Sequence, residues 1–159
     1  MKYRLISVGK IQEPFYAAGI NEYLKRLKPY VKIDMIMGLE EKTHPKASQK
    51  DLEKVVLKEG ERILNLIGEN QLVVLLDIQG KPLDSVYWAE QITKWNNSGT
   101  SVVNLIVGGS YGVSAQVKQR ADYIFSFSQM TFPHQMAVLI LVEQIYRGFK
   151  IILKEPYHK

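Results

Sequence analysis

The run Leu72-Val73-Val74-Leu75-Leu76-Asp77 is almost continuously apolar and stops at a single carboxylate. Antiparallel strands with one wet face alternate apolar and polar side chains, whereas parallel strands are covered on both faces and form unbroken apolar runs. The run therefore predicts a buried strand in a parallel sheet. A second run of the same kind, from Ser101 to Val107, supports this prediction.

Segments with helical periodicity alternate with these strand-like segments along the whole chain. Ser48 and Asp51 have the spacing of a capping box that begins one helix, and Gly68 is its expected end. The expected strands are 2–8, 31–38, 72–77, 101–107 and 122–126, and the expected helices are 14–28, 49–67, 85–95, a short one through 117, and 136–153. The pattern predicts an α/β fold with a mostly parallel sheet, helices on both faces and a single domain over residues 1–159.

The composition is that of an ordinary soluble protein, with 46% apolar and 23% charged residues. The longest stretch without a polar side chain, Met136 to Val142, is far shorter than a membrane span, and no signal-peptide core is present. The absence of cysteine excludes disulfides and agrees with a reducing cytoplasm. A net charge of +5 fits a nucleic-acid partner, although an evenly spread surface charge fits equally well.

Three polar or glycine-rich segments fall at the ends of expected strands: Leu76 to Gly80, Gly108 to Gly112, and Phe127 to His134. Because the carboxyl ends of parallel strands share one edge of a sheet, these segments are expected to converge on one ligand. The first continues into an expected turn over 78–82. The glycines match neither phosphate-binding loop pattern, and Gly108-Gly109 alone also fits a tight strand-to-helix turn.

The three histidines, His44, His134 and His158, have no zinc-binding spacing, and no metal site is expected. The simplest role of His134, which follows a proline, is that of a hydrogen-bonded residue in a first helical turn. The tail Tyr157-His158-Lys159 groups three polar side chains. These patterns indicate a basic α/β domain with one composite site and do not name a reaction.

Seven short motifs occur in order along the chain: Val8–Lys10, Glu22–Arg26, Asp77–Lys81, Gly108–Gly112, Thr131–His134, Glu143–Arg147 and Tyr157–Lys159. Together they resemble the bacterial ribosomal RNA large subunit methyltransferase H family of the SPOUT superfamily. The resemblance covers the whole chain, and the combination of motifs is specific although each one is weak.

This resemblance implies a C-terminal trefoil knot, a homodimer, and S-adenosylmethionine as the methyl donor. It implies that the acceptor is N3 of a pseudouridine in 23S rRNA, within the assembled 70S ribosome in the cytoplasm. The positions that match the family's donor-binding residues are Leu76, Gly108, Phe127, Ser128, Gln129, Met130, Thr131 and Phe132.

The resemblance also implies that the tail of one subunit completes the site of the other. Tyr157 and His158 are then expected to place the acceptor base and handle its proton, while Lys159 and Arg147 hold phosphate or the uracil carbonyls. The helix 136–153 is apolar on all sides, which favours burial in a dimer.

Two positions depart from the family pattern. Val138 stands where arginine is usual, and Gly148 stands where alanine is usual. Since an arginine there could contact RNA phosphate, its loss leaves open a paralogue that binds the donor and rRNA but is inactive or retargeted. A generic nucleotide-binding α/β protein is a third alternative.

Overall fold

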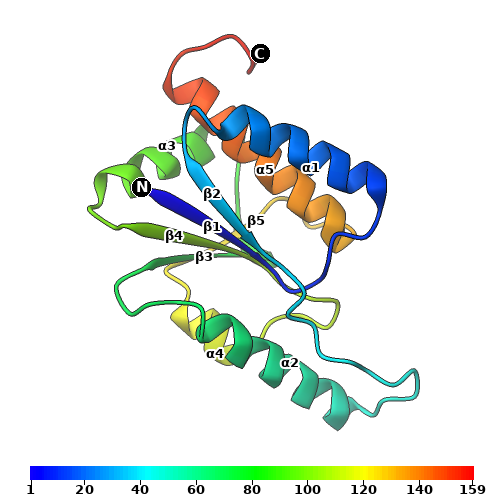
Figure 1. The fold of residues 1–159 in the computed structure, drawn as a ribbon. Helices are drawn as coiled ribbons and strands as arrows, with labels where there is room; N and C mark the ends of the chain where they lie inside the picture. Colours follow the sequence, from blue (N-terminus) through cyan, green and yellow to red (C-terminus); the bar gives the residue numbers. More distant parts are fainter.

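The computed structural model describes residues 1–159, and its centre is a five-stranded sheet (Figure 1). The strand order is β2-β1-β4-β3-β5, and every neighbouring pair is parallel. The strands are β1 (Lys2–Ser7), β2 (Lys32–Ile36), β3 (Leu72–Pro82), β4 (Val102–Val107) and β5 (Tyr123–Ser126). The predicted parallel α/β architecture is confirmed.

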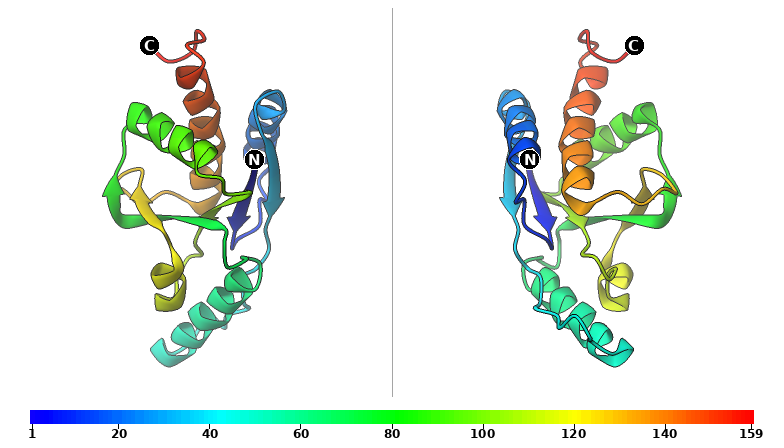
Figure 2. Two further views of the ribbon diagram at one scale, coloured as in Figure 1. Left: turned by 90° about the vertical axis from the view of Figure 1, so that its left-hand side faces the viewer. Right: turned by 90° about the vertical axis from the view of Figure 1, so that its right-hand side faces the viewer.

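Helices cover both faces of this sheet, as predicted (Figures 1 and 2). On one face lie α1 (Pro14–Leu27), α3 (Ser85–Asn97) and α5 (His134–Ile152). On the other lie α2 (Gln49–Leu64) and the short α4 (Ala115–Arg120). The two faces form separate apolar clusters, the larger one beneath α1, α3 and α5.

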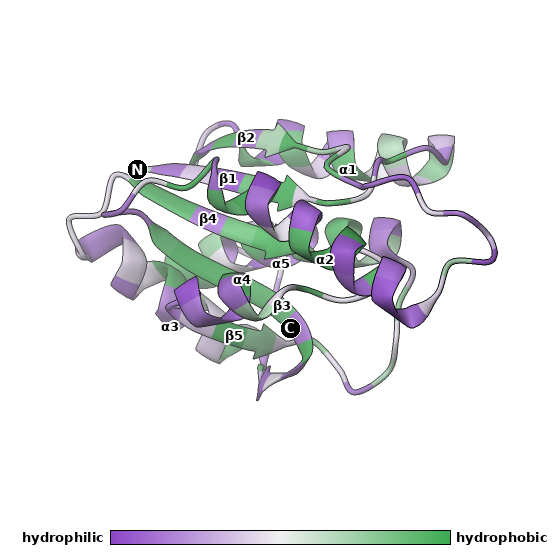
Figure 3. Cartoon of the chain, turned by 90° about the horizontal axis from the view of Figure 1, so that it is seen from below, coloured by the Kyte–Doolittle hydropathy of each residue, from purple (hydrophilic) through white to green (hydrophobic).

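Side chains of the central strands alternate between these two clusters. Tyr3 and Leu5 of β1 pack into the larger cluster, while Ile6 points to the smaller one. All six residues of β4 are buried, and the hydrophobic colour runs along much of β3, β4 and β5 (Figure 3). Burial on both faces is why these segments are continuously apolar, as the sequence indicates.

The start of α2 was predicted correctly, whereas its predicted end was wrong. The Asp51 amide donates to Ser48 Oγ at 3.2 Å and the Ser48 amide donates to Asp51 Oδ2 at 3.0 Å, which completes the capping box. The helix ends at Leu64, before Gly68. Leu66 and Ile67 continue the apolar pattern because they pack against the smaller cluster from the following loop.

The segment 78–82 is part of β3 rather than the predicted turn. β3 pairs with β5 twice, first through Val74–Leu76 and again through Lys81 and Pro82 after an irregularity. A Cβ atom at Gly80 would lie 2.6 to 2.8 Å from backbone atoms of β5. The glycine therefore permits the second pairing by letting the two backbones approach, and a turn signal read locally could not show this.

α5 lies between α1 and α3 (Figure 2), so much of its apolar surface is covered within the protomer. Val138 is fully buried in the larger cluster. A Cβ at Gly148 would lie 2.5 Å from Ile92 Cδ1, which shows how closely α5 approaches α3. None of the helices combines the length and hydropathy needed to cross a bilayer.

Candidate functional site

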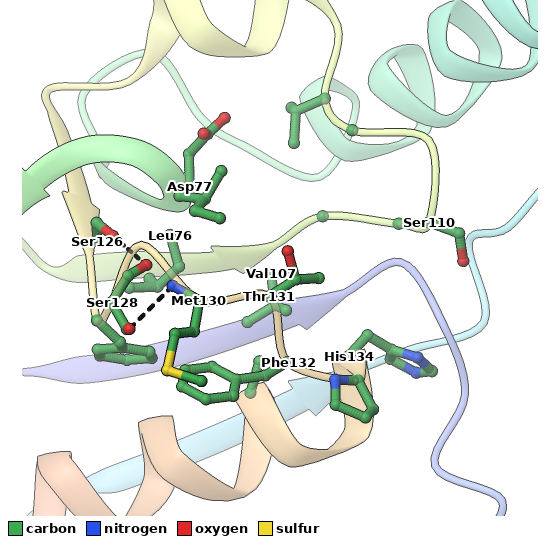
Figure 4. Close-up of a pocket in the computed structure, with 18 residues that line it drawn as sticks. Leu76, Asp77, Val107, Ser110, Ser126, Ser128, Met130, Thr131, Phe132 and His134 are labelled. Atoms are coloured by element: carbon green, nitrogen blue, oxygen red, sulfur yellow. Dashed lines mark hydrogen bonds between the residues drawn. The ribbon is translucent and has the colours of Figure 1, made fainter.

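A cavity of ≈ 450 Å³ opens at the carboxyl ends of β3, β4 and β5 (Figure 4). Its walls come from three parts of the chain: residues 76–78, 107–113 and 126–137. These are the three strand-end segments singled out in the sequence, and their convergence is confirmed. The volume lies within the range of small-molecule sites, which is about 300–1,000 Å³.

Seven of the eight residues expected to hold the donor line this cavity, and Gln129 does not. Four further wall residues lie outside the three predicted segments, namely Val107, Val113, Ser126 and Ala137. Val113 and Ala137 reach the cavity only because a loop and α5 pack beside the sheet. Such neighbours depend on tertiary packing and leave no local pattern.

The loop from Phe127 to Pro133 is shaped by hydrogen bonds of its own serines. Ser126 Oγ donates to the Ser128 carbonyl oxygen at 2.8 Å, and the Met130 amide donates to Ser128 Oγ at 3.0 Å (Figure 4). Met130 is 73% exposed although it lines the cavity. The loop therefore presents an apolar side chain at the mouth, where a ligand would cover it.

The glycines after β4 form the opposite wall. A Cβ at Gly108 would lie 2.5 Å from Val113 Cγ2, and Gly112 has a φ of +87°. Positive φ is readily adopted only by glycine. The sequence left two roles open for this segment, a ligand-binding wall and a tight turn. Both apply, because the tight turn is itself a wall of the cavity.

Asp77 ends the regular part of β3 and lines the cavity. Its carboxylate lies 3.0 Å from Lys118 Nζ of α4 and accepts from the Gln79 amide at 2.9 Å. Burial raises the pKa of Asp77, but the amide hydrogen bond and the Lys118 ammonium together outweigh it, so the net pKa is lowered. Asp77 is thus a fixed anion that joins β3 to α4.

His134 is the first residue of α5, and its ring points toward the loop after β1 (Figure 4). Its Nε2 lies 2.9 Å from the Lys10 carbonyl oxygen. A carbonyl can only accept, so Nε2 donates. This hydrogen bond gives the ring nitrogen a partner, as expected for a residue in the first turn of a helix. A Cβ at Gly9 would lie 2.4 Å from Nε2, so only glycine lets the ring sit here.

Glu59, which the sequence analysis missed, is a buried acid close to this site. It is 5% exposed; Oε1 accepts from the Glu41 amide at 3.0 Å, while Oε2 is buried without a partner. Burial is the main reason that its pKa is raised. A signal did exist, since Val55, Glu59 and Ile63 are spaced four apart and form one buried stripe of α2.

The tail residues gather around Glu143 and away from the cavity. Arg147 Nε and Nη2 donate to Glu143 Oε1 at 3.0 and 2.6 Å, and the Tyr157 hydroxyl donates to the same oxygen at 3.0 Å. His158 Nδ1 lies 3.4 Å from Arg147 Nη1, and Lys159 is exposed. We call Glu143, Arg147, Tyr157 and His158 the tail cluster.

Within one chain the tail cluster lies away from the cavity. Ala137 is the last residue of α5 that lines the cavity. Glu143 and Arg147 follow it by six and ten residues, about 9 and 15 Å along the helix axis. Three of the four residues expected to act in catalysis, Arg147, Tyr157 and His158, therefore form one group, whereas Lys159 is exposed outside it. This group lies at a distance from the expected donor site of its own chain.

The hydrogen bonds of the tail cluster define its protonation. Burial is the largest cause of the raised pKa of Tyr157, and its bonds to Tyr23 and Glu143 add to it. Because the guanidinium of Arg147 only donates, Nδ1 of His158 is the acceptor, and Nε2 is left to carry the ring proton. Apart from the Glu143 carboxylate, which accepts from Arg147 and Tyr157, the cluster thus offers donors and a cation. No group of three or more His, Asp or Glu side chains is placed to hold a metal ion.

Residues 1–158 match the family model described as predicted SPOUT methyltransferase. Three similar bacterial proteins are each named ribosomal RNA large subunit methyltransferase H. The chain is 50% identical to the one from Syntrophomonas wolfei, 49% to that from Halothermothrix orenii and 46% to that from Enterococcus faecalis. Each alignment spans 159 residues and all of both chains.

Proposed function

The chain belongs to the SPOUT methyltransferase family, and from this premise we propose that it methylates N3 of a pseudouridine in 23S rRNA of the assembled ribosome. The observation that carries the proposal is the convergence of three strand-end segments on one cavity, in a chain similar over its full length to rRNA methyltransferases. S-adenosylmethionine is the proposed methyl donor, and the cytoplasm is the proposed location.

The cavity residues fit this donor. Leu76, Phe127 and Phe132 supply apolar walls for the adenine ring, and the glycine turn after β4 brings backbone N–H groups close. Seryl hydroxyls are available for the ribose and amino-acid groups. The donor supplies an electrophilic sulfonium methyl group, so the protein has to align donor and acceptor and accommodate the departing proton.

We assign the tail cluster to the donor cavity of a second copy in a homodimer. Glu143 and Arg147 of the tail cluster lie about 9 and 15 Å along α5 from Ala137 of their own cavity, which supports an action in trans. Tyr157 and His158 place the acceptor base, and Arg147 with Lys159 holds phosphate or the uracil carbonyls. The expected role of Tyr157 and His158 in handling the proton stays a prediction; the Tyr157 hydroxyl donates to Glu143, and its pKa is raised.

The alternative of an inactive or retargeted paralogue has no support. It assumed that residue 138 faces RNA, but Val138 is fully buried in the apolar cluster under α5. Its replacement of arginine is a change of packing. Membership of the family removes the generic nucleotide-binding alternative and implies a trefoil knot in the C-terminal part.

The test is transfer of a labelled methyl group to 70S ribosomes that lack the modification, with 50S subunits and free rRNA beside them. We expect transfer to 70S alone, and mass spectrometry of the nucleosides should place the label on N3 of pseudouridine. Removal of Tyr157–Lys159 should abolish transfer while calorimetry shows unchanged donor affinity. Loss of donor binding in that variant would contradict the division of roles.

A further inference from the structure

A second cavity of ≈ 270 Å³ adjoins the donor cavity, and Gly109, Ser110 and His134 line both. Two of its walls come from loops, the one after β1 and the one after β2, and a third comes from Glu59 of α2. It is smaller than a typical drug-sized site, which is about 300–1,000 Å³, and suits a single base. Its other wall residues include Lys10, Gln12, Glu40, Glu41 and Thr43.

The buried oxygen of Glu59 gives this cavity a chemical function. Oε2 has no hydrogen-bond partner, and a Cβ built on Gly109 would lie only 3.1 Å from it. Because residue 109 is a glycine, it places no side chain against that oxygen, which is itself almost inaccessible to solvent. A buried carboxylate oxygen without a partner is costly, so its presence beside a cavity calls for a ligand that donates to it.

Glu59 stands apart from the other carboxylates that line the two cavities. Asp77 is paired with Lys118, and its pKa is lowered. Glu41 is paired with Arg62 and with Lys58, and Glu40 is exposed. Glu59 alone is buried, has an oxygen without a partner and has a raised pKa.

We propose that the smaller cavity receives the acceptor base, a uracil-type ring, and that Glu59 takes the proton from its N3. The inference rests on the proposed function and adds the site of the base and the proton acceptor. The edge of a uracil-type ring presents a carbonyl, an N–H and a second carbonyl. A carboxylate among the donors Lys10, Gln12 and Thr43 is complementary to that edge, whereas a cytosine-type ring has no proton at N3 to give.

The step balances in atoms and charge. The N3–H bond breaks, its proton passes to Glu59 Oε2, and its electron pair forms the bond from N3 to the methyl carbon. The carbon–sulfur bond breaks with both electrons left on sulfur, so one positive and one negative charge disappear together.

The surroundings of Glu59 make it a stronger base than an exposed acid. Burial raises its pKa most, the Glu41 amide and Arg62 lower it, and the charges of Glu40 and Glu41 raise it, with a raised pKa as the net result. Lys10 and His134 also line its cavity. A base with a pKa nearer to neutrality transfers protons more effectively at neutral pH.

The test compares Glu59→Gln with Glu61→Gln, which removes an exposed carboxylate two residues further along α2. Glutamine at position 59 can still accept from the Glu41 amide. We expect Glu59→Gln to bind S-adenosylmethionine like the wild type and to lose single-turnover methyl transfer to 70S ribosomes by about 10²- to 10⁴-fold. Glu61→Gln should be unchanged in both.

Two further readouts separate a proton acceptor from a structural residue. The wild-type rate should rise with pH through the pKa of Glu59 and then level off, whereas the residual rate of Glu59→Gln should keep rising as hydroxide removes the N3 proton. The second readout is the free energy of unfolding, which can be measured without any methyl transfer. A raised folded pKa contributes stability below that pKa and loses it as pH rises through it, so Glu59→Gln should match or exceed the wild type at neutral pH.

The inference is overturned if Glu59→Gln transfers methyl groups at the wild-type rate, or if its rate falls by the same factor at every pH. Should Glu59→Gln fold poorly, Glu59→Asp keeps a carboxylate drawn back by one methylene and should show an intermediate rate with the plateau retained. A wild-type and Glu61→Gln protein that both fail to methylate would overturn the proposed function, and this inference with it.

Discussion

Mixed dimers provide a direct test of whether the tail acts in trans. Thr131→Arg places a bulky cation in the donor cavity at an exposed residue, so it should exclude the sulfonium donor without disturbing the fold. A second variant ends at Pro156 and lacks the tail but keeps its cavity. Each variant alone should be inactive on 70S ribosomes.

The expected activity of the mixture follows from the separation of the two groups. Since Arg147 lies about 15 Å along α5 from Ala137 of its own cavity, a tail is expected to serve the cavity of the other chain. In a mixed dimer the intact cavity of the truncated chain meets the intact tail of the other chain, and the second site is doubly defective. Random association of equal amounts gives half mixed dimers, so about one quarter of the wild-type rate should return.

The assay is the initial rate of labelled methyl transfer after the subunits have been dissociated and reassociated, or after co-expression with two different tags. Purified mixed dimers should then reach about half of the wild-type rate, because one of two sites is intact. Inactive mixed dimers that still bind the donor would refute the reasoning. So would full activity of the truncated variant alone, since the tail would then have no role.

Three further outcomes are expected. Gly80→Ala should lower the unfolding free energy by about 1–3 kcal/mol in urea, because its Cβ would press on the backbone of β5; an unchanged midpoint would contradict the double pairing of β3. Asp77 has a lowered pKa, so its stabilising effect is present above the unfolded pKa of an aspartate and is lost as pH falls through the folded pKa. The stability of wild type and Asp77→Asn should therefore converge in acid, and a Lys118→Met variant should show a weaker acid dependence than the wild type. Met130→Ala should weaken donor binding about tenfold or more with no loss of stability, because an exposed side chain becomes covered by the donor. Met37→Ala, which is also exposed but lies away from the cavity, should leave the affinity unchanged.

Most of the fold was predictable because its signals are local. Continuous apolar runs identified the buried parallel strands, and the pair Ser48 and Asp51 identified the start of α2. The errors arose where tertiary contacts decide. Gly80 looks like a turn residue but allows β3 to meet β5 again, and Leu66 and Ile67 extend a helical pattern beyond the helix that they follow.

The candidate site was predictable to the same extent and for the same reason. Parallel strands end at one edge of the sheet, so the strand-end segments had to converge. The approach of α5 to that edge is a matter of packing, and this is why Ala137 was missed. Glu59 could have been found from its place in the buried stripe of α2. The position of the tail relative to the cavity depends on the length and direction of α5, which no motif encodes.

Glu59 also shows how a departure from local rules can identify a site. Its stripe on α2 is otherwise apolar, and Val55 and Ile63 on either side of it are buried. An apolar residue at position 59 would continue that stripe and remove the cost of a buried carboxylate oxygen without a partner. Natural sequences tend to accept such costs at functional sites. On these two proposals the groups around the acceptor base have two origins, a carboxylate from α2 beside the donor cavity and donors and cations from the tail of a second copy. Because the two sets do not touch within one chain, base uptake and proton removal can be impaired separately, the first by truncation of the tail and the second by Glu59→Gln.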